Sequence, residues 1–248
     1  MNQTYWLQIS LESDTAFTRG DGIAGVVNAE VQHDEFGLPY LGGKTLKGLL
    51  TAACAEVMSA LERAKPELYD DWKKSAERLF GKPGGGPAEA GCLHIGDARL
   101  PDDLCAAVAR DHQPGAPTPG LTPADVLESL TTLRRQTAMD TETGAPLENS
   151  LRASRVILRE TVFASRVEVV PLLGGRQISP EEAQRDLALL AASVRALRRA
   201  GAHRNRGLGK IRVELFDQDP FDENSAAITE DAFQFFKDAF EKKQEVPA

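Results

Sequence analysis

The chain has 248 residues, 42% of them hydrophobic and 27% charged, which fits one large domain with a sizeable core. Its net charge of −8 argues at first sight against a nucleic-acid partner, yet residues 150–215 hold 13 Lys/Arg against 6 Asp/Glu, and the distribution of charge matters more than its sum. No apolar run is long enough to cross a bilayer and the start MNQTYWLQIS lacks the pattern of a secretory signal, so we expect no membrane partner.

The first half of the chain alternates extended segments, glycine-rich turns and one long helix. TYWLQISLES alternates apolar and polar residues, which predicts a strand, and VVNAEVQHD predicts a second extended segment. From LPYLGGKTLKG onward apolar residues recur at helical spacing, and Thr45 is the predicted helix cap. GKPGGGPAEAG predicts a surface loop, and CLHIGDARL predicts a short strand with Asp97 capping its end.

The second half begins with a proline-rich segment, residues 111–124, which is predicted to form no regular element. Alternation from Phe163 to Val169 predicts a strand. ISPEEAQRDLALLAASVRALRRAG predicts a helix that Ser179 caps, that Pro180 begins and that Gly201 ends. RNRGLGKIRVELF predicts a loop followed by a strand, and ITEDAFQFFKDAFEKK predicts a short amphipathic helix.

The order strand, helix, strand occurs twice, and this order predicts an α+β fold of the ferredoxin-like (βαββαβ) type. Such a fold has an antiparallel sheet with one open face, the plan that RNA-recognition modules use. The three cysteines are odd in number and lack metal-ligand spacing. They are therefore interpreted as reduced thiols of a cytoplasmic protein rather than as a disulfide framework or a zinc site.

The turn GLPYLGGKTLKGLL places two glycines before Lys44 and Thr45 at a predicted helix start. Backbone amides and the helix dipole can be aimed at a phosphate from such a turn. A phosphate-binding P-loop would need glycine at position 38, where this chain has Leu38, so a nucleotide hydrolase is not predicted. A glycine turn that packs the helix on the sheet is a compatible interpretation, with Lys44 and Lys47 on the exposed end of the helix.

Two further segments combine basic residues with turns. In RRQTAMDTETGAP, Arg134 and Arg135 either clamp phosphates or lie at the solvent-exposed tip of a hairpin. In RNRGLGKIRV, Gly207 and Gly209 would let the backbone approach another chain closely. The neighbouring basic residues, which supply positive charge, are Arg204, Arg206 and Lys210.

These motifs, in this order, resemble those of the RAMP (repeat-associated mysterious protein) family. LPYLGGKTLKG resembles the family's P-x-I-P-G-S-S-L-K-G turn, and LFG…LHIGDARL resembles its FG…S-D-A segment. RRQTAMDTETGA resembles R-x-x-x-x-I-D-R-x-T-G-A, and RNRGLGKIRV is similar to the G-x-x-R-G-x-G-x-V loop. The resemblance extends to Leu215 and points to the backbone subunits that lie along the guide RNA in type III CRISPR effector complexes.

The resemblance implies a modified ferredoxin-like or RNA-recognition fold with insertions. It implies a RAMP-type RNA-binding domain over residues 1–215, with insertions near 81–91 and 111–154, and an acidic tail with a short amphipathic helix over 216–248. The segment 139–154 would form a thumb-like hairpin that displaces one nucleotide of the guide–target duplex. Base pairing would read the sequence, while the protein contacts phosphates.

The partners implied are the guide RNA, the complementary target RNA and other subunits of the complex. The predicted RNA-binding residues are Arg19, Gly43, Lys44, Thr45, Lys47, Arg134, Arg135, Arg204, Arg206, Gly207, Gly209 and Lys210.

The resemblance also bears on catalysis. Cleaving members carry an aspartate before the glycine turn, and matching outward from LPYLGGKTLKG places Asn28 there and Asp34 at a second acidic position. An amide cannot carry the charge that a metal ion or a proton transfer would need. No metal or cofactor is therefore expected, and Mg²⁺ enters only if Asp21 or Asp34 supports cleavage. A simpler interpretation of Asp21 is that it stabilises a glycine turn.

Three functions remain open from the sequence. A guide-RNA-binding subunit without its own cleavage activity is favoured. The alternatives are a metal-dependent endoribonuclease that cuts target RNA, and a capping or adaptor subunit that contacts neighbouring proteins through its acidic tail.

Overall fold

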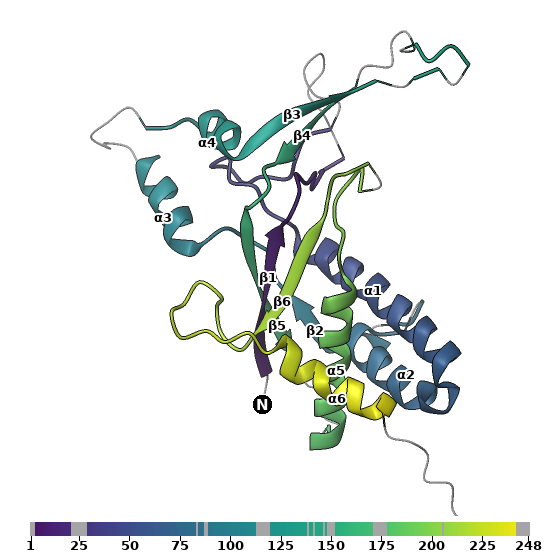
Figure 1. Cartoon of the computed structure of the whole chain (residues 1–248). Helices are drawn as coiled ribbons and strands as arrows, with labels where there is room; N and C mark the ends of the chain where they lie inside the picture. Colours follow the sequence, from purple (N-terminus) through teal and green to yellow (C-terminus); the bar gives the residue numbers. More distant parts are fainter. Residues whose placement is uncertain are drawn as a thin grey trace, which may run out of the picture.

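A computed structural model describes residues 3–20, 29–82, 84–86, 89–112, 120–137, 139–140, 142–145, 147, 152–170, 178–204 and 206–241 (Figure 1). The strands are β1 (Gln3–Leu11), β2 (Leu93–Ile95), β3 (Thr131–Gln136), β4 (Arg152–Ile157), β5 (Val162–Val169) and β6 (Ile211–Phe216). The helices are α1 (Gly43–Ala64), α2 (Pro66–Phe80), α3 (Asp102–Asp111), α4 (Pro123–Leu130), α5 (Pro180–Ala196) and α6 (Thr229–Glu241).

The central sheet has four strands in the order β2-β5-β1-β6, and each neighbouring pair is antiparallel. In chain order this sheet and its covering helices follow the sequence β1-α1-β2-β5-α5-β6, which is the βαββαβ arrangement. The predicted α+β, ferredoxin-like fold is therefore confirmed. The elements α2, α3, α4, β3, β4 and α6 are additions to this plan.

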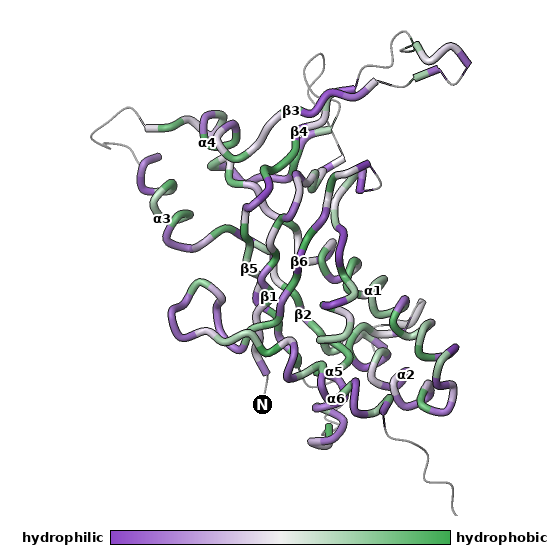
Figure 2. Tube along the Cα trace, viewed as in Figure 1, coloured by the Kyte–Doolittle hydropathy of each residue, from purple (hydrophilic) through white to green (hydrophobic). Residues whose placement is uncertain are grey.

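The core lies between the sheet and one layer of helices. Successive side chains of a strand point to opposite faces, and Leu7, Ile9 and Leu11 of β1 are all buried on the same face. Figure 1 shows α1, α2, α5 and α6 together on one side of the sheet. Figure 2 shows that hydrophilic residues gather along the outer half of β3, away from this core.

Several predicted elements are confirmed, with shifted ends in two cases. α5 begins as predicted, because the Ser179 hydroxyl accepts a hydrogen bond from the Glu182 N–H and Pro180 takes the first helical position. The helix ends at Ala196 rather than at Gly201. Thr45 is not the cap of α1, which begins two residues earlier, at Gly43.

Two predictions from composition are wrong in part. Where it is described, the extended segment before Asp34 makes isolated bridges, such as Thr18 with Val31, and no regular strand. The proline-rich segment 111–124 overlaps the start of α4, because Thr122 caps that helix and Pro123 is its first residue. Residues 113–119 lie outside the described part of the chain.

Within the predicted insertion, β3 and β4 form a two-stranded hairpin that stands beyond one end of the sheet (Figure 1). The proposed thumb, residues 139–154, connects these strands and is described only in part. In the predicted tail, α6 packs on the core through Phe236, whose ring lies 4.6 Å from that of Trp72. No described helix is both long enough and apolar enough to span a bilayer.

The three cysteines are free thiols, two of them buried and one partly exposed. Burial raises the pKa of Cys92 to about 11, so only about 0.1% of this thiol is ionised at pH 8. We expect iodoacetamide at pH 8 to modify Cys105 first, and Cys54 and Cys92 only on unfolding. Peptide mass spectrometry along a time course checks this, and native-state labelling of Cys92 as fast as of Cys105 would contradict it.

Candidate nucleic-acid interface

The start of α1, expected to face a phosphate, is occupied by a carboxylate of the chain itself. The N–H of Gly43 donates to Asp97 Oδ1 at 2.9 Å, and Asp97 also pairs with Arg99 at 3.5 Å. An anion at this position satisfies the orphan amide and the helix dipole. Asp97, predicted to cap a strand end, therefore caps α1 and would repel a phosphate placed there.

The two lysines of this turn differ in their surroundings. Lys44 is exposed and, among the described residues, has no partner for its ammonium group. Lys47 is partly buried, and its Nζ donates to the carbonyl oxygen of Leu93 at 2.7 Å, which ties α1 to β2. Burial lowers the pKa of Lys47. The expectation that Lys47 lies on the exposed end of the helix is therefore wrong.

The glycine-rich loop before β6 is anchored on its own chain at one glycine and open at another. Gly209 has φ +72°, and a Cβ there would lie 2.2 Å from the carbonyl oxygen of Ala200. Its N–H donates to the carbonyl oxygen of Asp14 at 3.0 Å. Gly207 has φ +82° with no atom within 4 Å of the Cβ position. Close approach by another molecule is thus possible at Gly207 and not at Gly209.

The basic side chains of this loop also divide into two groups. Arg204 and Arg206 are exposed, and no described residue pairs with either guanidinium. Lys210 is held by Glu12, with 2.8 Å between Nζ and Oε2. The two arginines therefore carry net positive charge at this loop, whereas that of Lys210 is largely offset.

Asp14 connects the loop to the hairpin. The Asp14 side chain is buried. Its Oδ2 accepts two hydrogen bonds from the guanidinium of Arg134 in β3, and its Oδ1 accepts one from the backbone N–H of Arg159 at 3.1 Å. Arg134 is thus oriented by Asp14 rather than free to clamp a phosphate. Arg135, the next residue of β3, is exposed and lacks a partner within the described ranges.

A second ion pair connects the segment near Arg19 to the hairpin. Glu30 is buried and its carboxylate lies 2.9 Å from Nε of Arg155 in β4, while Arg155 also donates to Thr131 of β3. The N–H of Arg19 donates to the carbonyl oxygen of Glu30 at 3.2 Å. Arg19 therefore lies at the same end of the molecule as the hairpin.

The predicted RNA-binding residues thus fall into two places. The start of α1 contacts β2, which is one edge of the sheet, and the glycine-rich loop leads into β6, which is the other edge. Two strands separate these edges, so they are about 14 Å apart. Figure 1 shows the loop between α5 and β6 near the base of the β3–β4 hairpin.

Of the catalytic candidates, only Asp34 lies among the described residues, and it belongs to no metal-binding group there. Asp34 Oδ1 accepts hydrogen bonds from the N–H groups of Phe36 and Leu38, both at 3.0 Å, and so closes the turn before α1. Asp21 and Asn28 lie outside the described residues. Among the residues described, no group of three or more His, Cys, Asp or Glu is placed to hold a metal ion.

Sequence reasoning missed Asp14 and the true role of Asp97. Both act on partners far along the chain, since Asp97 is 54 residues from Gly43 and Asp14 is 120 residues from Arg134. Neither has a local signal in the sequence. The nearest clue is that Asp14 follows a predicted strand and Asp97 is predicted to cap one, and at such places a short acidic side chain often closes a turn.

Comparison with known proteins supports the family resemblance. A model of the RAMP superfamily matches residues 9–212, whereas no curated protein matches. A chain of the type III-B Cmr-beta complex with cognate target RNA is 13% identical with a TM-score of 0.56, over 86% of this chain and 96% of that one. A chain of the apo complex is also 13% identical, with a TM-score of 0.55 over 89% and 98%. Identity this low establishes a shared fold alone, but the family model covers most of the sequence, and the chain belongs to the RAMP superfamily.

Proposed function

We propose that this chain is a guide-RNA-binding subunit of a type III CRISPR effector complex. Its partners would be the guide RNA, the complementary target RNA and other subunits, in the cytoplasm. The family supports this role, as does the similarity to chains of a complex that binds cognate target RNA. The observation that carries it is a group of exposed arginines around the open glycine Gly207 and the hairpin, for which the described part of the chain offers no carboxylate partner.

The proposed contacts follow from which side chains are already neutralised. Arg135, Arg204 and Arg206 have no carboxylate partner among the described residues, so each can bind a phosphate without breaking an ion pair. Arg134 and Lys210 are paired with Asp14 and Glu12, and would contribute less. Such contacts fix the position of a strand and leave sequence recognition to base pairing.

The proposal includes no RNA cleavage by this subunit. Asp34, one of the two candidate aspartates, is used by the turn that it closes. The endoribonuclease hypothesis therefore rests more on Asp21 than on Asp34, whose Oδ1 is engaged in that turn. Replacing Asp21 and Asp34 each by alanine in the assembled complex and measuring target-RNA cleavage tests that hypothesis directly.

The RNA-binding role predicts a specific effect of charge reversal. The double variant Arg204→Glu/Arg206→Glu should bind guide RNA about 100-fold more weakly, because two charge-assisted contacts are lost. The slope of log affinity against log salt should fall by about 2. Titration of labelled guide RNA at several salt concentrations measures both quantities.

The matched control is Lys73→Glu/Lys74→Glu on α2, which changes the net charge equally at an exposed site. Its RNA affinity should change far less than that of the arginine variant. Equal losses in the two variants would mean that only overall charge matters, and would contradict a defined interface at the glycine-rich loop. Intact RNA binding in both, with lost assembly after removal of residues 217–248, would favour the adaptor hypothesis.

A further inference from the structure

The outer edge of β6 carries a pocket of about 360 Å³ between the end of α5 and the start of α6. β6 is an edge strand, paired with β1 on one side only. Volumes of this size hold small ligands or single monomer units of a polymer. Four consecutive residues of β6, from Ile211 to Glu214, line the pocket, and Val213 is one of them.

Along the outer edge of β6, backbone hydrogen bonds are found at Ile211 and at Leu215, which lie on either side of Val213. The N–H of Ile211 donates to the carbonyl oxygen of Arg198 at 3.0 Å, and the carbonyl oxygen of Leu215 accepts from the N–H of Ile228 at 2.8 Å. Outward-pointing backbone groups recur at every second residue of a strand, so the N–H and C=O of Val213 also point outward. In the described structure no partner is found for them.

Val213 lines the pocket and is only 5% exposed, so its two outward-pointing backbone groups are largely shielded from open solvent. Nearly all buried backbone groups in proteins are paired with protein, water or ligand. An added β-strand would need a longer run of free edge, but the positions of Ile211 and Leu215 are already taken. The pocket therefore fits a compact planar group that presents one donor beside one acceptor.

The walls match such a group. Val194, Leu197 and Ala227 offer apolar surface. The charged residues that line the pocket are mostly paired, in the ion pairs Arg195–Glu230, Lys210–Glu12 and Arg212–Glu214. Arg198 is exposed, and no described carboxylate pairs with it. The pocket thus combines a donor–acceptor edge, apolar walls and one uncompensated guanidinium.

We propose that this pocket binds one ribonucleotide. The base pairs with the N–H and C=O of Val213 through its donor–acceptor edge, and its phosphate contacts Arg198. Arg198 and Lys210 flank the glycine-rich loop, so an RNA strand held there can place one unstacked nucleotide against β6. The nucleotide would come from the bound RNA, so this site rests on the proposed RNA-binding function.

The test is titration of the full-length protein with adenosine 5′-monophosphate, followed by the ¹H–¹⁵N signal of Val213. Saturable binding with a shift of this signal is expected. Arg198→Ala should weaken binding about ten-fold through loss of a charge-assisted contact. Ala227→Trp, which fills the pocket, should abolish the Val213 shift while the remaining spectrum stays that of the folded protein.

Ribose 5-phosphate and a short extended acidic peptide are the comparison ligands. Equal binding of ribose 5-phosphate would reveal a plain anion site, and a Val213 shift with the peptide alone would reveal a peptide site. Either result overturns the proposal, as does the absence of any shift with the nucleotide. If guide RNA binds and adenosine monophosphate does not, only the pocket assignment fails. If adenosine monophosphate binds and guide RNA does not, the proposed function fails instead.

Discussion

Replacement of Gly43 by alanine is expected to lower the free energy of unfolding by about 3 kcal/mol. A Cβ at this position would lie 2.3 Å from the carbonyl oxygen of Ile95 and 2.7 Å from backbone atoms of Gly96. These atoms cannot move easily, because β2 is paired with β5 and the N–H of Gly96 donates to Arg166. The helix would have to move away from the sheet, and the hydrogen bond to Asp97 would weaken. Urea denaturation of both proteins measures the loss.

Gly48 supplies the matched control within the same helix. It is exposed, and no atom lies within 4 Å of its Cβ position. Gly48→Ala should therefore raise the free energy of unfolding by about 1 kcal/mol through helix propensity alone. The same chemical change thus has opposite signs five residues apart. A Gly43→Ala protein as stable as the parent would show that α1 does not pack tightly on β2.

The sheet and the main helices were predictable because their signals are local. Alternation marks β1, β5 and β6, and the Ser179-Pro180 pair marks the start of α5. The start of α1 was not predictable, because its cap is supplied by Asp97 from a distant part of the chain. Local rules favoured Thr45, a good capping residue at the wrong place.

The residues near the candidate interface were predictable from the sequence. Which of their side chains are already paired within the chain was not. Basic residues and glycines mark the loop and the hairpin in the sequence. Whether a cation is free depends on partners that lie 46 residues away for Lys47 and 120 residues away for Arg134. The role of Gly209 also depends on a distant contact, because its backbone packs closely against Ala200 of the same chain. Distant pairing therefore decides which predicted contacts remain available to RNA.

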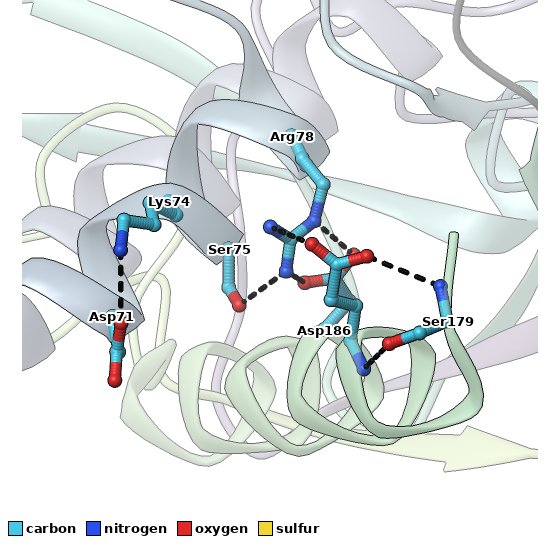
Figure 3. A network of polar contacts seen from close by, with 7 residues as sticks. Asp71, Lys74, Ser75, Arg78, Ser179 and Asp186 are labelled. Atoms are coloured by element: carbon cyan, nitrogen blue, oxygen red, sulfur yellow. Dashed lines mark hydrogen bonds and ion pairs between the residues drawn. The ribbon is translucent and has the colours of Figure 1, made fainter. Parts of the chain in front are cut away.

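Loss of the Arg78 side chain is expected to destabilise the fold by about 4 kcal/mol. Figure 3 shows this arginine of α2 between Ser75 and Asp186 of α5. Its Nε and Nη2 donate to the two carboxylate oxygens of Asp186 at 2.9 and 2.6 Å, and Nη2 also donates to Ser75 at 2.9 Å. Arg78 and Asp186 are 8% and 3% exposed, so Arg78→Ala leaves a buried carboxylate without its counter-charge. Thermal and urea unfolding measure the change.

Two controls separate charge from packing. Arg78→Met/Asp186→Leu removes both charges and keeps apolar volume, so it should cost far less than Arg78→Ala. Lys74→Ala breaks an exposed pair with Asp71 on the same helix, and its effect should stay within about 0.5 kcal/mol. A double variant as unstable as Arg78→Ala would show that the shape of the ion pair, rather than the unpaired charge, determines the loss.

The pH dependence of the Arg78→Ala variant provides the sharper test. Burial raises the pKa of Asp186 above its ordinary value even in the parent, where hydrogen bonds from Arg78 and Ser75 oppose the shift, and the loss of Arg78 raises this pKa further. A raised carboxyl pKa in the folded state means that the folded variant binds the proton more readily than the unfolded chain. Protonation then stabilises the variant, and this stabilisation is lost as the pH rises through the folded pKa. The deficit relative to the parent should therefore be smaller at pH 5 than at pH 8. An equal deficit at both values would attribute the loss to the missing stem of Arg78 rather than to the uncompensated charge of Asp186.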